Sequence, residues 1–149
     1  MAAFFDFATL LTALESHAAS LNVFDQVNAY QPPDVPNTGI TCAIWAERIN
    51  PDPAASGLNT TTARIEMNVR VYTSAEQTPY DAIDPQVMNA VSSLLGAYNG
   101  AFTLGGLVRD IDVLEAGARA GYINQAGNVL RVMTITLPIV INDLWAQVA

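Results

Sequence analysis

One segment of the chain, residues 60–73, alternates strictly between apolar and polar side chains, which is typical of a β-strand with one buried face. The apolar positions are Ala63, Ile65, Met67, Val69 and Val71, and the polar positions are Thr62, Arg64, Glu66, Asn68, Arg70 and Tyr72. At about 3.3 Å per residue this strand would be roughly 45 Å long, whereas a compact chain of this length has a diameter of roughly 40 Å. A second apolar segment, residues 129–141, gives roughly 43 Å by the same arithmetic. We therefore expect part of each strand to extend beyond a lone globule and to contact another chain.

The remaining patterns predict two helices and several shorter strands. Asp6 can cap a first helix whose apolar residues recur with the helical period, and Asp84 with Pro85 can begin a second helix that ends at Asn99-Gly100. Residues 40–49 read as a strand that pairs with residues 60–73, so that residues 50–59 form the tip loop of a long hairpin.

Further short elements surround this framework. We expect a short extended piece at 23–27, a proline-rich loop at 31–39, strands at 107–114 and 122–123, a turn at 124–128 and a short C-terminal helix at 142–149. The class is α+β, in which a mainly antiparallel sheet is covered by two helices, and residues 1–149 form a single domain.

The side-chain inventory opposes most catalytic mechanisms. The chain has one Cys, one His and no Lys, which removes phosphate-binding loops, Schiff-base chemistry and kinase-type mechanisms. No Gly-x-Ser-x-Gly elbow surrounds any serine. We therefore expect no enzymatic activity, no catalytic residue and no cofactor.

Charge and hydropathy limit the partners. The net charge of −8, with arginines as the only cations, opposes a protein built to bind nucleic-acid phosphates, although an acidic wall would let DNA slide past without binding. Only 13% of the residues are charged, so partner subunits are expected to cover part of the surface. The longest apolar runs fall short of a membrane span, and the N-terminus lacks the basic region of a secretory signal, so we expect assembly in a cytoplasm.

A few residues remain as candidates for a site. His17 lies on or beside the apolar face of the first helix and Cys42 lies in an apolar strand, so we expect both to pack in the core or at an interface. Asp110, Asp112 and Glu115 form the densest acidic cluster, which would hold a divalent cation only if further oxygen atoms converged on it. We predict a solvated or subunit-facing acidic surface and no metal.

The polar face of the long strand offers a second candidate. Arg64, Glu66 and Arg70, with Tyr72 beside them, form either an ordinary solvent face or a polar seam. In the seam the arginines would meet carboxylates such as Asp110 or Asp112 of an adjacent copy.

Several segments together resemble a known family. They are residues 3–11 (AFFDFATLL), 39–45 (GITCAIW), 80–85 (YDAIDP), 122–123 (YI) and 130–138 (LRVMTITLP). They resemble tail terminator or minor tail proteins of long-tailed bacteriophages that infect actinobacteria. The resemblance implies a virion structural protein at the head-tail interface, typically a ring of six copies that caps the tail tube, contacts the tube protein and a head-completion protein, and lets DNA pass.

Two other readings stay open at this point. In the same virion the chain could be a head-completion protein or another minor tail protein. In a different class, it could be a small acidic binding module that recognises a peptide by strand addition along the exposed hairpin edge.

Overall fold

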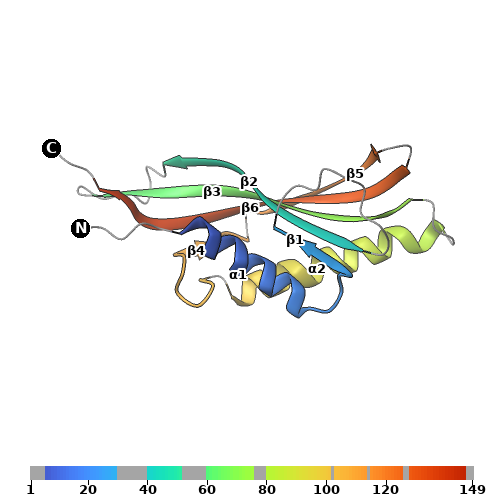
Figure 1. Ribbon diagram of the computed structural model, residues 1–149, viewed down its shortest axis with the longest axis horizontal. Coiled ribbons are helices and arrows are strands. Elements are labelled where there is room, and N and C mark those ends of the chain that lie inside the picture. The colour runs from blue at the N-terminus through green and yellow to red at the C-terminus, as the bar shows by residue number, and fades with distance from the viewer. Residues whose placement is uncertain are drawn as a thin grey trace.

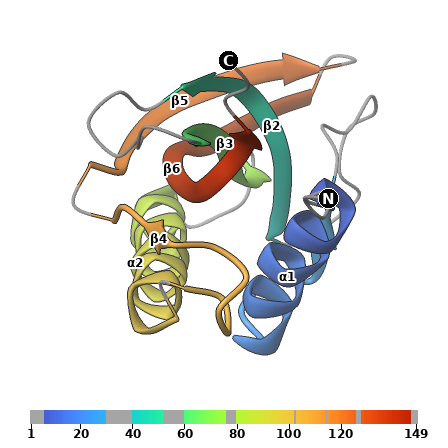
Figure 2. The ribbon, with the colours of Figure 1, turned by 90° about the vertical axis from the view of Figure 1, so that its left-hand side faces the viewer.

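A curved six-stranded sheet forms one layer of the fold, and two helices cover one of its faces (Figure 1). The computed structural model describes residues 6–29, 40–51, 60–75, 80–101, 103–113, 115–125 and 128–146. The helices are α1 (Phe7–Ser20) and α2 (Ile83–Gly100), and a 3-10 turn, η1 (Tyr80–Ala82), leads into α2. In the end-on view both helices lie below the sheet, β2 curves upward from beside α1, and β5 lies along the top (Figure 2). The predicted α+β class is confirmed.

Three long strands form the centre of the sheet. β3 (Thr60–Ser74) pairs antiparallel with β2 (Thr41–Pro51) on one side and with β6 (Asn128–Ala146) on the other. β1 (Gln26–Asn28) pairs parallel with the start of β2, and both β4 (Asp110–Ile111) and β5 (Gly117–Gln125) pair antiparallel with β6. The predicted long hairpin of residues 40–49 with 60–73 is therefore confirmed.

The apolar and polar residues of β3 lie on opposite faces of the sheet, as their alternation predicts. Ile65, Met67, Val69 and Val71 are at most 3% exposed and belong to the main core with the buried faces of α1 and α2. The alternate residues of β3 lie on the opposite face, which we call the outer face of the sheet. β3 and β6 run past the start of α1 at one end of the molecule (Figure 1), and they pair with each other over nearly their whole length.

The first helix begins where the sequence predicts. The Asp6 carboxylate accepts hydrogen bonds from the Ala8 amide at 3.0 Å and from the Thr9 hydroxyl at 2.9 Å, so it caps α1. The buried residues of α1 are Leu10, Leu14 and Ala18. Leu14 also forms a hydrogen bond with α2. Its carbonyl accepts from the hydroxyl group of the fully buried Tyr98 at 3.0 Å. The two helices are thus joined by a hydrogen bond as well as by packing.

The predicted C-terminal helix is wrong for the residues that the structure describes. Residues 142–146 continue β6, and Trp145 and Ala146 pair with Thr61 and Thr60 at the start of β3. The long β3 offers backbone donors and acceptors to this segment, whereas a helix of eight residues is marginal by itself. Residues 147–149 lie outside the described residues.

The start of α2 also differs from the prediction. Its N-cap is Ala82, which provides no side-chain hydrogen bond, and Asp84 lies in the first turn. The Asp84 carboxylate instead accepts a hydrogen bond from Arg131 of β6 at 2.9 Å, so the acidic group joins α2 to the sheet. The helix does end at Gly100, as predicted, and Ala101 after it has a φ of −124°.

The shorter elements differ in extent. The strand predicted at 107–114 is only Asp110–Ile111, the one predicted at 122–123 grows to Gly117–Gln125, and the extended piece predicted at 23–27 is Gln26–Asn28. Residues 50 and 51, predicted as part of the tip loop, belong to β2. The rest of that loop, the proline-rich segment 31–39 and the turn residues 126 and 127 lie outside the described residues.

Candidate interaction surfaces

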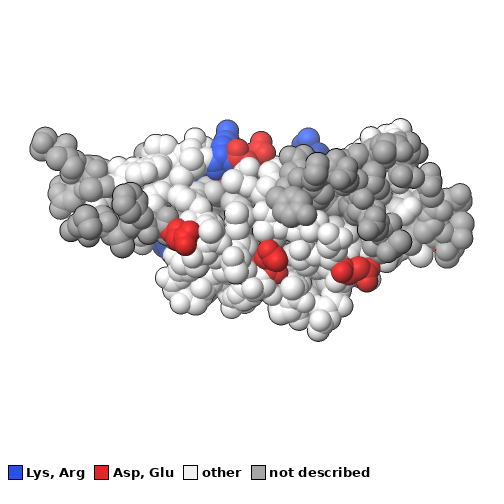
Figure 3. All heavy atoms as spheres, in the orientation of Figure 1, with Lys and Arg blue, Asp and Glu red and all other residues white. Residues whose placement is uncertain are grey.

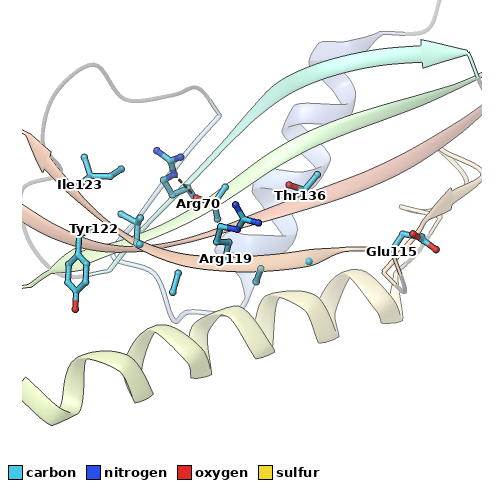
Figure 4. A pocket seen from close by; sticks show the side chains of 12 residues that line it. Arg70, Glu115, Arg119, Tyr122, Ile123 and Thr136 are labelled. Carbon is cyan, nitrogen blue, oxygen red and sulfur yellow. Dashed lines mark hydrogen bonds between the residues drawn. The ribbon is translucent and has the colours of Figure 1, made fainter.

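A groove of about 800 Å³ lies along β5 on the outer face of the sheet. Its wall and floor come from Arg70 of β3, from residues of β6 such as Thr134 and Thr136, and from residues 117–123 of β5. Figure 4 shows Arg70 and Arg119 with their guanidinium groups on the same side of the sheet, and Glu115 at one end of the groove. The strand register explains the arrangement, since Arg70 pairs with Thr134 and Thr134 pairs with Arg119.

Arg70 is held in place by its own chain. Its Nε donates to the Thr134 hydroxyl at 2.8 Å, and its guanidinium carbon lies 5.2 Å from the ring centroid of Trp45 and 5.8 Å from that of Tyr72. Burial raises the pKa of Tyr72, and the neighbouring Arg70 opposes that rise. A guanidinium stacked on two aromatic rings and bonded to a hydroxyl has little rotational freedom left. Arg70 is therefore a preorganised cation at the edge of the groove.

Arg119 is the exposed cation of the same groove. Within the described part of the chain it has no hydrogen bond or ion pair. In contrast, Arg48, Arg64 and Arg131 each pair with a carboxylate. The neighbours of Arg119 on β5 are small residues. No atom lies within 4 Å of a Cβ built at Gly117, and the nearest atom to a Cβ built at Gly121 is a Val132 methyl at 3.9 Å. The groove beside Arg119 is therefore open to an incoming side chain.

The second candidate surface is an apolar groove of about 290 Å³ on the helix side of β2. Phe7, Leu10 and Leu11 of α1 line it together with Ile49 and Ala46 of β2. Phe7 and Ile49 are each 43% exposed, which is unusual for large apolar side chains that lie side by side. The Met67 and Ile65 side chains close the groove from β3.

The residues predicted to form a seam between copies have partners inside the chain. The Arg64 guanidinium lies 3.3 Å from the Asp112 carboxylate, and Arg48 lies 2.7 Å from Glu66. Arg64 thus already has, within its own chain, a carboxylate partner of the kind that the polar seam would supply from an adjacent copy.

The remaining sequence candidates have ordinary structural roles. Cys42 is fully buried, and burial raises the pKa of its thiol to about 12. The ring of His17 meets that of Tyr98 edge to face, with centroids 6.4 Å apart, so it packs between the helices as predicted. Among the described residues no group of three or more His, Cys, Asp or Glu side chains is arranged to hold a metal ion. No described helix has the length and apolar character needed to cross a membrane.

Sequence reasoning missed the β5 groove. Arg119 lies in a run of glycine and alanine whose alternation carries little hydrophobic signal, so only Tyr122 and Ile123 indicated a strand. The one sequence feature that could have indicated this groove is Arg119 itself. It is a single cation in a run of glycine and alanine, within a chain of net charge −8.

Comparison with known proteins finds similarity among solved structures but none among protein families or curated sequences. No protein-family model matches the chain, and no curated protein sequence matches it. Among solved structures, the chain is similar to the sheath/tube terminator in the extended state of an extracellular contractile injection system, studied by cryo-electron microscopy. The two are 13% identical with a TM-score of 0.46, and the match covers 98% of this chain and 60% of the terminator chain. This chain therefore spans less than two thirds of the length of that protein.

Proposed function

We propose that this chain is a structural subunit of a phage tail or a phage-tail-like particle. Six copies form a ring that terminates the tail tube and later joins the tail to the head. The chain carries out no catalysis in this role and binds no cofactor, and its partners are other copies of itself, the tube protein and a head-completion protein. The resemblance of five sequence segments to tail terminator proteins supports this assignment.

The observation that carries the proposal is the presence of two unlike surfaces at opposite edges of one sheet. A closed ring of identical subunits needs heterologous contacts, in which one surface of each copy fits a different surface of the next. The groove that contains Arg70 and Arg119 lies along β5, whereas the apolar groove lies beside β2. β3 and β6 separate these two edges of the sheet. A self-complementary dimer would instead use one patch twice.

The distribution of charge is compatible with a DNA conduit. The chain carries 14 acidic residues against six arginines. Figure 3 shows acidic side chains over the helix layer, and along the upper edge, over the sheet, it shows arginine and acidic side chains next to each other. A ring that turned its acidic helix layer toward the lumen would repel DNA and let it pass without binding.

Tube capping in vitro tests this function directly. The purified chain is added to polymerising tail tube protein of the same particle, and the tubes are imaged by negative-stain electron microscopy. We expect shorter tubes that carry a ring of density at one end, whereas a heat-unfolded sample of the chain should leave the length distribution unchanged. Tubes of unchanged length without terminal density would contradict the assignment.

A protein-binding module is the second candidate, and the exposed β5 strand favours it. Residues 117–120 are exposed and, in the described part of the chain, β5 pairs with β6 alone. A strand with one unpaired edge accepts an extended peptide by main-chain hydrogen bonding. A stable monomer that binds peptides along β5 and leaves tube length unchanged would establish this reading instead.

A further inference from the structure

Among the strands that the structure describes, each side of the sheet has an unpaired edge. β1 covers β2 only at residues 41–43, so among the described strands none pairs with the outer edge of residues 44–51. β5 likewise has one partner, β6, along residues 117–125. The two unpaired edges have similar lengths, eight and nine residues. Such edges are a template for pairing with another chain.

The strand directions make these two edges compatible. β2 is antiparallel to β3, β3 to β6, and β6 to β5, so β5 runs opposite to β2. A second copy in the same orientation would therefore place its β2 antiparallel to this β5. Rotation about an axis along the strands preserves that orientation from copy to copy, as a ring requires.

Side chains on the outer face are complementary in charge. The register of β2 shifts between Ala46 and Arg48, and Glu47 at this bulge accepts a hydrogen bond from Asn68 of the outer face at 2.6 Å. When Glu47 of the next copy lies opposite Arg119, the unpaired cation of the groove gains a carboxylate. Arg48 adds little repulsion there, because Glu66 already pairs with it at 2.7 Å.

The same register also fits small residues against large ones. It places Trp45 of the next copy opposite Gly121, where only the Val132 methyl lies within 4 Å of a built Cβ. On the helix side it places Ile49, 43% exposed, opposite Ala118. Cross-strand pairs of an aromatic ring with glycine, and of apolar residues with each other, are favourable contacts in sheets.

We infer that neighbouring copies join by strand addition, with residues 44–51 of one copy extending the sheet of the next along β5. Glu47 then pairs with Arg119, and both grooves are partly filled at the same junction. The inference rests on the proposed ring and specifies which two surfaces meet in it.

Charge reversal with complementary mixing tests the inference. The variants Arg119→Glu and Glu47→Arg should each raise the dissociation constant between copies at least about tenfold, because like charges then face each other. An equimolar mixture of the two variants should recover assembly, since every junction in an alternating ring pairs one acid with one arginine. The control is Arg109→Glu, whose side chain bonds Asn142 elsewhere and should leave assembly unchanged.

Sedimentation velocity over a range of concentrations gives the result, with circular dichroism confirming that each variant is folded. If the wild type assembles and neither variant weakens that assembly, the strand junction is wrong. The same holds if the mixture of variants does not recover assembly. Either result would leave the proposed ring intact. A wild type that stays monomeric at every concentration, alone and in the presence of tube protein, would overturn the ring itself, and the junction with it.

Discussion

Removing the Arg70 side chain should destabilise the monomer, although Arg70 lies on a polar face of the sheet. The comparison is between Arg70→Ala and Arg119→Ala, two arginines that line the same groove. Arg70 stacks on Trp45 and Tyr72 and donates to Thr134, whereas Arg119 is exposed. Position on the outer face alone would predict equal effects.

The contacts set the expected magnitude. A cation over an aromatic ring contributes about 0.5–1 kcal/mol at a partly exposed site, and a side-chain hydrogen bond contributes about 1 kcal/mol. Two ring contacts and one hydrogen bond that share a side chain are not additive, so we expect a loss of about 2 kcal/mol for Arg70→Ala. An exposed substitution such as Arg119→Ala should stay within about 0.5 kcal/mol of the wild type.

Urea unfolding measures the difference. With a slope of about 2 kcal/mol per molar urea, Arg70→Ala should lower the midpoint by about 1 M and leave the slope unchanged. Tryptophan fluorescence can follow the unfolding, and Trp45, whose ring lies beside the Arg70 guanidinium, contributes to that signal together with Trp145. Equal midpoints for the two variants would refute the claim that the aromatic rings and Thr134 hold Arg70. Arg70→Glu is for the same reason a poor probe of contacts between copies, since it perturbs the fold of each copy.

Substitutions at three further positions test the core and the helix start. Tyr98→Phe should cost about 1 kcal/mol in the free energy of unfolding, because the Leu14 carbonyl loses a buried donor; an unchanged melting temperature would show that the bond contributes nothing. Asp6→Ala should cost about 1 kcal/mol through loss of the α1 cap, and Asp6→Asn, which retains a capping oxygen, should recover most of it. Burial raises the pKa of Cys42 to about 12, so the unfolded chain loses this proton first and stability should fall as the pH rises from about 9 toward 12. Cys42→Ala should reduce that slope by up to about 1.4 kcal/mol per pH unit, and parallel pH profiles would contradict the assignment to Cys42.

The central strands could be predicted because their patterns are local. The alternation of residues 60–73 determines both the strand and the face that packs on the helices, and the Asp6 cap lies directly before an amphipathic segment. Hairpin pairing of β2 with β3 follows because the two strands are adjacent in sequence. These features need no information from distant parts of the chain.

The errors occurred where distant residues decide the structure. Residues 142–146 have a helical pattern, yet pairing with the start of β3 makes them a strand. Asp84 has the right position in the sequence for a cap, but its carboxylate forms an ion pair with Arg131 of β6 instead. Asp112 likewise pairs with Arg64, 48 residues away in the chain, and no local pattern in the sequence indicates this contact. The β5 groove was missed because it forms only when β3, β6 and β5 lie side by side.

The native mass of the purified protein tests the central claim most directly. One chain has a mass of 15.9 kDa, and light scattering coupled to size-exclusion chromatography measures the mass of the particle in solution without reference to its shape. We expect a species of about six times the chain mass that dissociates on dilution and when Arg119 is changed to Glu. A single species with the mass of one chain, unchanged up to millimolar concentration and in the presence of tube protein, would contradict the account.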